Sequence, residues 1–141
     1  MSSFKKLFAC LAVVAFLTSG FGGKTHAATK PIDSYTYSDY FTSAKWITRD
    51  KEISLSVYPK TTSPLITSHG NVQMVHATRA FSHLKSKWSG SSKWKNTKAM
   101  EAQFHCHVMG AGKMKTPWNL EPHRTETSLT KTILNGCNPE N

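Results

Sequence analysis

The sequence has few cysteines, few acidic residues and no apolar segment long enough to cross a membrane. Its 141 residues include 3 Cys, and 8 Asp and Glu stand against 18 Lys and Arg. A membrane-spanning helix needs roughly 20 apolar residues, whereas the main apolar run covers only residues 7–17. The chain also lacks an internal repeat and a long low-complexity tract, which excludes solenoid and collagen-like proteins. These absences leave one small, basic domain.

The N-terminus has the three parts of an export signal. Two lysines precede the apolar run over residues 7–17, and the segment ends on a small residue, Ala27. We therefore predict a signal peptide over residues 1–27, with cleavage after Ala28 as the alternative. Cys10 precedes most of the apolar run, which argues against a lipoprotein anchor. The expected product is secreted, extracellular and soluble.

Removal of this signal leaves two cysteines, Cys106 and Cys137. Exported proteins fold in an oxidising compartment, so we predict a disulfide between them. The two cysteines lie 31 positions apart. In the chain-entropy model a bridge over such a loop stabilises a domain by roughly 3–4 kcal/mol.

The expected mature chain is strongly basic. Three lysines leave with the signal, so 15 Lys and Arg remain against 8 acidic residues, a net charge of +7. Outside the cell such a protein meets teichoic acids, acidic phospholipid head groups, nucleic acid and anionic glycans. The alternative is that the charge serves solubility alone.

The first half of the mature chain predicts an extended lead-in, a hairpin and a helix. Residues 28–42 form the lead-in, and residues 43–141 form a single domain. Residues 45–48 and 53–58 predict a hairpin, because the second run alternates apolar and polar residues. In that run the side chains expected to face the core are Ile53, Leu55 and Val57.

A helix is predicted from Asn71, its expected N-cap, to Trp88. Its apolar side chains recur at helical spacing and are expected to face the core. They are Met74, Ala77, Phe81, Leu84 and Trp88. A second helix face is expected to be solvated, and it consists of His76, Arg79, His83 and Lys87.

A polar, basic connection over residues 89–98 carries Trp94 and leads to a segment with a period of two. Even positions from Met100 to Val108 are apolar and odd positions are polar, which predicts a central strand over residues 99–108. A short helix over residues 127–134 is expected to stop at Gly136. Together these elements predict an α+β fold, a small antiparallel sheet packed on one main helix with one disulfide.

Several motifs resemble the bacterial family called domain of unknown function 2599. They are Cys106-His107, Trp118-Asn-Leu-Glu-Pro122, Arg124 and Cys137-Asn-Pro139, together with Ala44–Asp50 and Trp94–Thr97. The resemblance covers about residues 43–139 and implies a secreted protein of Gram-positive bacteria with a paired-cysteine domain. It implies no mechanism. Family members often carry an aromatic residue at the position of His123, which argues against a catalytic role for it.

Metal binding is the first chemistry that the residues suggest. His105 and His107 would share one face of the expected strand, with Glu101 and His123 as further ligands. A His-x-His spacing is weak evidence, because any two histidines two apart on a strand share a face. We therefore expect neither a metal nor another cofactor.

Acid–base hydrolysis of an anionic substrate is the second chemistry that the residues suggest. His107 would act as acid or base with Glu121 as its partner, and Lys113 and Arg124 would stabilise the charge of a phosphoryl group. This set would suit a secreted nuclease or a phosphodiesterase-like toxin, but no nuclease signature is present. Nucleic acid is thus a partner without support from a motif.

Non-catalytic binding is the interpretation that we favour. Trp118, Asn119, Glu121 and Arg124 would form a rigid platform for a glycan or peptide, while the basic surface holds an anionic polymer of the cell envelope. The structural alternative places Trp118 in the core and pairs Arg124 with Glu121. The sequence predicts an extracellular interaction or effector domain, with a small hydrolase as the alternative. It does not predict the oligomeric state.

Overall fold

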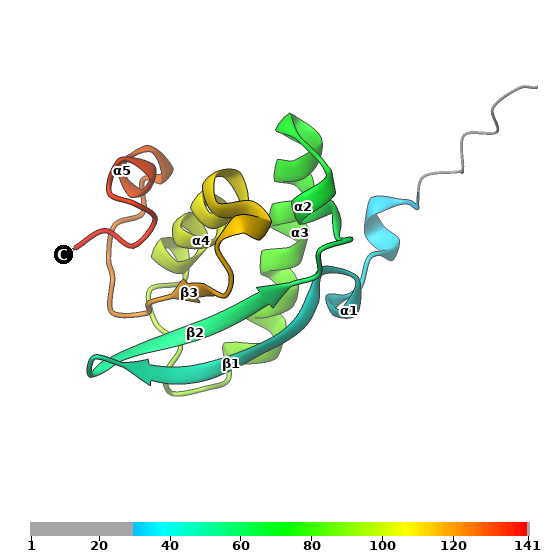
Figure 1. Cartoon of the computed structure of the whole chain (residues 1–141). Helices are drawn as coiled ribbons and strands as arrows, with labels where there is room; N and C mark the ends of the chain where they lie inside the picture. The colour runs from blue at the N-terminus through cyan, green and yellow to red at the C-terminus, as the bar shows by residue number, and fades with distance from the viewer. Residues whose placement is uncertain (1–29, 141) are drawn as a thin grey trace, which may run out of the picture.

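A three-stranded antiparallel sheet lies against a pair of helices in the computed structural model, which describes residues 30–140 (Figure 1). The expected signal peptide, residues 1–27, lies outside the described residues. Along the chain the elements are η1 (Ile32–Ser34), α1 (Tyr37–Tyr40), β1 (Phe41–Arg49), β2 (Glu52–Pro59), α2 (Pro64–Thr67), α3 (Gly70–Trp88), α4 (Thr97–Cys106), η2 (His107–Ala111), η3 (Gly112–Met114), β3 (Trp118–Leu120) and α5 (Leu129–Leu134). The predicted fold class is confirmed.

The sheet has the order β1-β2-β3, with both neighbouring pairs antiparallel. β1 and β2 form the predicted hairpin, which is longer and tighter than expected because Arg49 pairs directly with Glu52. The two residues between them, Asp50 and Lys51, both have positive φ, as a type I′ turn requires.

The hairpin projects beyond the helices (Figure 1). Leu55 and Val57 lie over the helices and are fully buried as predicted. The prediction that Ile53 faces the core was wrong, because this residue lies on the projecting part. Ile53 lies close to the turn and is 38% exposed.

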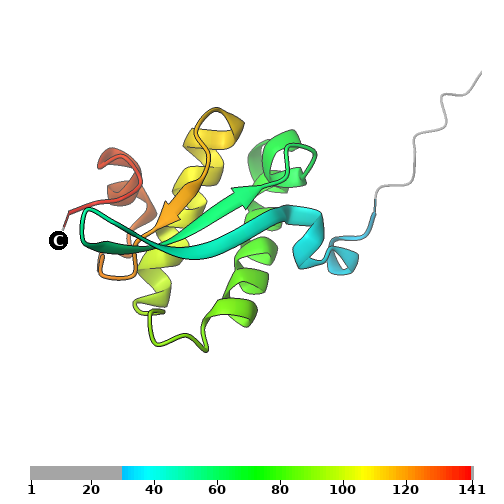
Figure 2. The ribbon, with the colours of Figure 1, turned by 60° about the horizontal axis from the view of Figure 1, so that its bottom comes forward.

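α3 and α4 lie side by side on one face of the sheet, behind the strands in both views (Figures 1 and 2). The predicted helix over residues 71–88 is confirmed as α3, although its N-cap is His69 rather than Asn71, and it has no side-chain capping bond. The core between helices and sheet is rich in aromatic rings. Phe104 of α4 lies at its centre, with ring centroids 5.8 Å from Phe81 and 5.7 Å from Trp118.

The prediction of a strand over residues 99–108 was wrong, because residues Thr97–Cys106 form α4. Met100, Phe104 and Val108 are spaced by four, so they share one helix face and join the core. The opposite side is also buried, at Ala102 and Cys106. A helix covered on two sides needs apolar residues on both, and an alternating pattern supplies them.

Gln103, expected to face outward, is fully buried and fastens β3 to α4. Its Oε1 accepts a hydrogen bond from the backbone N–H of Glu121 at 2.7 Å, and its Nε2 donates to the backbone carbonyl of Glu121 at 3.1 Å. The side-chain amide thus satisfies two backbone groups at the end of an edge strand, where a further strand would otherwise be needed.

The predicted disulfide joins Cys106, at the end of α4, to Cys137 beyond α5, with 5.3 Å between their Cα atoms. The short helix predicted near residues 127–134 is α5, and Gly136, expected to end it, follows with φ of 70°. The disulfide therefore holds the C-terminal segment against α4, which α5 also contacts.

The N-terminal lead-in, expected to be extended, contains η1 and α1, and its last two residues begin β1. It covers the face of α3 that we expected to be solvated. His83 Nε2 lies 2.9 Å from the carbonyl oxygen of Tyr35, Arg79 donates to the carbonyl of Asp33 at 2.7 Å, and Lys87 lies over the ring of Tyr37. His76 contacts Tyr40 on the same face. The helix pattern located this polar face correctly but could not show that another segment covers it.

Replacement of Gln103 by Leu tests the attachment of β3. The variant keeps a buried side chain of similar size but leaves the N–H and carbonyl of Glu121 without partners. We expect the free energy of unfolding to fall by about 1–3 kcal/mol, measured by urea denaturation. Lys98→Leu, an exposed change on the same helix, should stay within about 0.5 kcal/mol. Equal stability of both variants would show that these bonds do not hold the strand.

Candidate functional site

The motif at residues 118–122 forms β3 and the loop after it, and its aromatic residue lies in the core. Trp118 is fully buried, packs edge-on against Phe104, and donates from Nε1 to the carbonyl of Gly112 at 3.1 Å. A ring with no exposed face cannot stack on an external sugar. The structure therefore agrees with the alternative in which Trp118 plugs the core, and not with an exposed platform.

Glu121 is the second buried member of the motif, and its carboxylate is held between two arginines. Arg124 Nε donates to Oε2 at 2.7 Å, and Arg49 reaches within 3.6 Å of Oε1. The side chain of Glu121 is only 5% exposed, whereas that of Arg49 is 56% exposed. A buried carboxylate must be paired, and here Arg124 supplies the close partner and pins the loop.

His107 lies at the end of α4, stacked parallel to Trp118 with 6.3 Å between ring centroids. Burial lowers its pKa, while interactions with the Asn119 backbone and the Asn138 side chain oppose that shift. Its Nε2 is buried and has no hydrogen-bond partner within the described part of the chain. The imidazole is therefore mainly neutral near pH 7.

The predicted catalytic set does not assemble into an open site. His107 and Glu121 interact electrostatically, but the carboxylate of Glu121 is occupied by Arg124 and shielded from solvent. Lys113 lies in η3, and its side chain falls outside what the structure describes. A substrate could reach Glu121 only by displacing an arginine.

The pairing of His105 with His107 as metal ligands required a strand, since residues two apart on a helix point to different sides. Both flank the end of α4. Among residues 30–140 no group of three His, Cys, Asp or Glu is placed to hold a metal ion. His123, the remaining candidate ligand, has its Nδ1 3.2 Å from Oε2 of Glu52.

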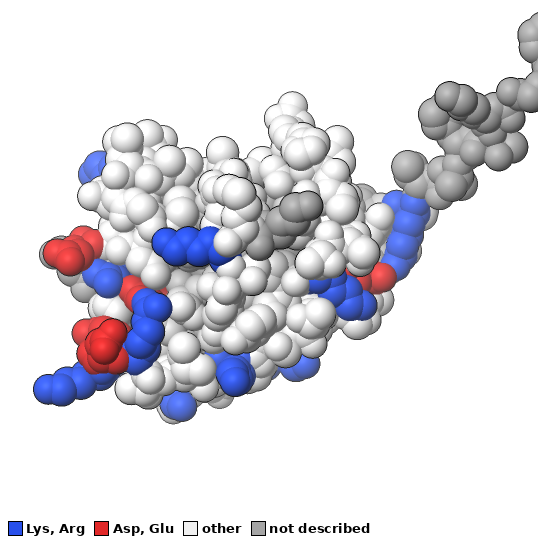
Figure 3. All heavy atoms as spheres, viewed as in Figure 1, with Lys and Arg blue, Asp and Glu red and all other residues white. Residues whose placement is uncertain are grey.

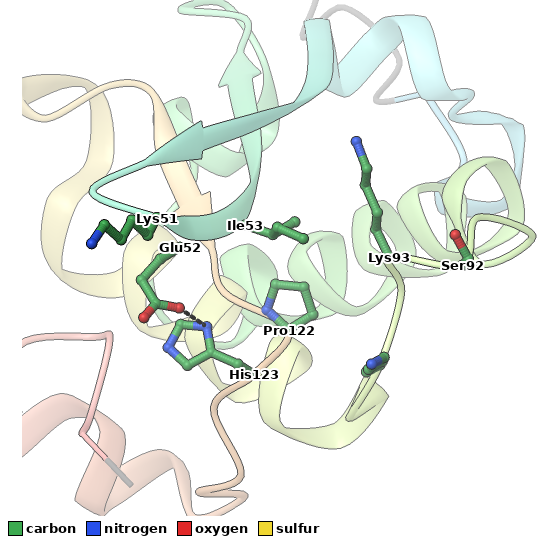
Figure 4. A pocket seen from close by; sticks show the side chains of 8 residues that line it. Lys51, Glu52, Ile53, Ser92, Lys93, Pro122 and His123 are labelled. Atoms are coloured by element: carbon green, nitrogen blue, oxygen red, sulfur yellow. Dashed lines mark ion pairs between the residues drawn. The ribbon is translucent and has the colours of Figure 1, made fainter.

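A groove of about 450 Å³ lies beside the Glu121–Arg124 pair (Figure 4). No sequence pattern predicted this groove. Three segments meet there: the hairpin turn, the α3–α4 connection and the loop after β3. Its lining residues are Lys51, Glu52, Ile53, Ser92, Lys93, Lys95, Pro122 and His123. The basic connection over residues 89–98 was the only signal for it, and nothing in the sequence places that connection next to the hairpin.

The motif positions one wall of this groove. Asn96 donates from Nδ2 to the carbonyl of Pro122 at 2.9 Å, which ties the α3–α4 connection to the loop after β3. Glu121, immediately before Pro122, is fixed by Gln103 through its backbone and by Arg124 through its side chain. The motif residues therefore support the groove, and exposed neighbours line it.

The charges around the groove are mainly positive. Lys51, Lys93 and Lys95 line it, and no ion pair involves these lysines among residues 30–140. Its single lining carboxylate, Glu52, faces His123. Between the lysines, Ile53 and Pro122 provide an apolar floor (Figure 4).

The comparisons with known proteins return one family. The model of a family described as protein of unknown function (DUF2599) matches residues 41–140. No curated protein and no solved structure is similar enough to match the chain. In the described residues, no helix is long and apolar enough to cross a membrane.

Arg124→Ala distinguishes a structural pair from a ligand-binding arginine. Loss of the close partner leaves the buried carboxylate of Glu121 poorly compensated, so we expect the free energy of unfolding to fall by roughly 3–5 kcal/mol. Arg49→Ala removes the exposed, more distant partner and should cost at most about 1 kcal/mol. Thermal or chemical denaturation of the two variants measures the difference. Wild-type stability of Arg124→Ala would mean that the pair does not pin the loop.

Acidification should destabilise the protein through its buried histidines. Burial lowers the pKa of His76, His105 and His107, whereas the unfolded chain binds these protons near a pKa of about 6.5. The stability from the neutral rings is complete above that value and is lost as pH falls through the lower folded pKa values. Urea midpoints measured from pH 7 to 5 should therefore decrease.

His107→Gln should flatten this pH dependence, because one buried titrating group is gone. His69→Gln, at an exposed position, serves as the matched control and should follow the wild-type profile. A stability that rises on acidification would contradict the assignment of neutral, buried histidines.

Proposed function

The chain belongs to the DUF2599 family of proteins of unknown function, and we propose that it is an extracellular module that binds an anionic polymer of the cell envelope in the groove beside Pro122. One observation carries this proposal. Among residues 30–140, three lysines that form no ion pair surround an apolar floor, in a groove whose walls are held together by the hydrogen bond from Asn96 to Pro122. The expected export signal supports the extracellular setting, and the expected Gram-positive origin would make teichoic acid the envelope polymer.

The shape of the groove suits a linear ligand. It is an open hollow between three segments rather than an enclosed cavity (Figure 4). Lysine is a point charge on a flexible stem, so it accepts phosphate or carboxylate groups without demanding one geometry. The apolar floor of Ile53 and Pro122 can pack against the carbon backbone of a polyol or sugar between two charges.

Charge is distributed unevenly on the molecule, which favours a defined binding region. In the view of Figure 3, basic side chains alone follow the lower edge, whereas both signs meet at the end of the hairpin. Binding by uniform surface charge would not depend on which lysines are removed. Binding in the groove would.

Hydrolysis has weaker support from the geometry. A catalytic pair needs a base within reach of the substrate, and Glu121 is enclosed by its arginine partners. The groove itself contains lysines, one histidine and one carboxylate. The histidine, His123, and the carboxylate, Glu52, are paired with each other. Binding requires only the exposed charges, so it explains the site with fewer assumptions.

A matched pair of double variants tests the groove. Lys93→Ala with Lys95→Ala removes two groove charges, and Lys45→Ala with Lys85→Ala removes two exposed charges elsewhere. Each lysine near an anionic surface contributes about 1 kcal/mol, so the loss of two should weaken binding to purified teichoic acid by about 2 kcal/mol, roughly thirtyfold. The control variant should lose much less.

Retention of the wild-type protein should fall as ionic strength rises from about 0.05 to 0.5 M, because exposed charges are screened. Equal losses in the two double variants would assign binding to general surface charge. No retention of the wild-type protein on teichoic acid at low salt would overturn the proposal.

A further inference from the structure

A second hollow, of about 630 Å³, lies at the opposite end of α3 from the groove. It is bounded by the N-terminal segment, the connection from β2 into α2, and the first turn of α3. Its polar lining includes Lys30, Lys60, Thr62, Ser68 and His76. Neither the sequence motifs nor the proposed groove includes these residues.

His76 is the most strongly positioned residue of this hollow. It is 9% exposed, and its Nδ1 lies 2.9 Å from the hydroxyl of Tyr40, which is fully buried. The ring of Tyr35 packs edge-on against the imidazole at 4.8 Å. These contacts fix the ring and leave Nε2, which has no partner among residues 30–140, as the nitrogen available to a ligand.

Lys60 supplies an uncompensated positive charge, since no ion pair involves it in the described part of the chain. The acidic side chain of the hollow, Asp39, is already satisfied. Its Oδ2 accepts from Lys30 at 2.8 Å and from the backbone N–H of Thr36 at 2.7 Å. Asp39 therefore does not neutralise Lys60.

The N-terminus of α3 adds a further positive contribution. The first amides of a helix lack carbonyl partners, and they carry the positive end of its dipole. Here the N-cap residue, His69, forms no side-chain capping bond, and the first turn contains no acidic residue. Ser68 and Val72, on either side of this helix start, both line the hollow. Of the first turn of α3, Val72 lines the hollow, and His76 lines it one turn further along the same helix.

We propose that this hollow is a phosphate-binding site, in which Lys60, the His76 ring and the first turn of α3 hold the oxygens of a phosphate group. A helix N-terminus with a nearby cation is a favourable environment for phosphate. The volume exceeds that of one ion, so the phosphate would carry an attached sugar or polyol. The proposal does not depend on the groove, because the two sites lie at opposite ends of a helix about 27 Å long.

Nuclear magnetic resonance of the histidine side chains tests the site. Titration of the folded protein with inorganic phosphate should shift the imidazole resonances of His76 and leave those of His123, at the groove, unchanged. Burial lowers the pKa of His76, and a bound anion should raise it, because a neighbouring negative charge favours the imidazolium form. Tyr35 and Tyr40 contact the His76 ring, and the charged groups that line the hollow with it are Lys30, Asp39 and Lys60.

Two lysine variants separate this site from general charge effects. Lys60→Ala should weaken phosphate binding about tenfold, as expected for loss of one charge-assisted contact. Lys85→Ala makes the same charge change on an exposed part of α3 outside the hollow and should leave the affinity within about twofold. Circular dichroism confirms that both variants are folded.

Two further ligands distinguish a phosphate monoester from a phosphodiester as the natural ligand. Tighter binding of glycerol phosphate than of dimethyl phosphate supports a monoester, and the reverse supports a phosphodiester within a polymer. Unchanged His76 resonances, a shift confined to His123, or equal losses in Lys60→Ala and Lys85→Ala would each overturn the site. None of these results bears on the groove, whose test uses Lys93 and Lys95.

Discussion

The paired hydrogen bonds between the Gln103 side chain and the backbone of Glu121 are the constraint on which the rest of the structure depends. β3 has only three residues and pairs with β2 on one side, so the ladder alone cannot fix where its following loop lies. The amide of Gln103 fixes that point on α4. Trp118 and Leu120 then enter the core, and Pro122 is placed beside the hairpin.

The same constraint explains why the motif at residues 118–122, with Arg124, is mainly structural. Trp118 fills the core, and Glu121 with Arg124 closes a loop that would otherwise bury an unpaired charge. Such a motif resembles a binding site in sequence, because both roles require a large aromatic residue and paired charges. Burial distinguishes them, and burial depends on contacts with α4 that are distant in sequence.

Local patterns allowed the hairpin, α3, α5 and the disulfide to be predicted, because each is encoded by adjacent residues or by the two cysteines outside the expected signal peptide. The error at residues 99–108 has a specific cause. Apolar residues at every second position fit a strand, but they also fit a helix buried on two sides, as α4 is. Helix-forming residues such as Ala99, Met100 and Gln103, with no β-branched residue from Lys98 to His107, were the signal that favoured a helix. The groove and the hollow were beyond prediction, since each is built from three segments that only the fold brings together.

The direction of α3 relates the two proposed anion-binding regions, the groove and the hollow, to each other. At its N-terminus the backbone amides lack a side-chain cap, and Val72 of the first turn lines the hollow together with Lys60. At its C-terminus the dipole is negative, and basic residues accumulate there: Lys85 and Lys87 in the last turn, then Lys93 and Lys95 in the connection. The first pair compensates the helix end, which leaves the second pair available to a ligand. Positive potential is therefore present at both ends of α3. The backbone supplies it at the N-terminus, and lysine side chains supply it beyond the C-terminus. A polymer with repeated phosphates could occupy both, whereas a single small anion could occupy only one.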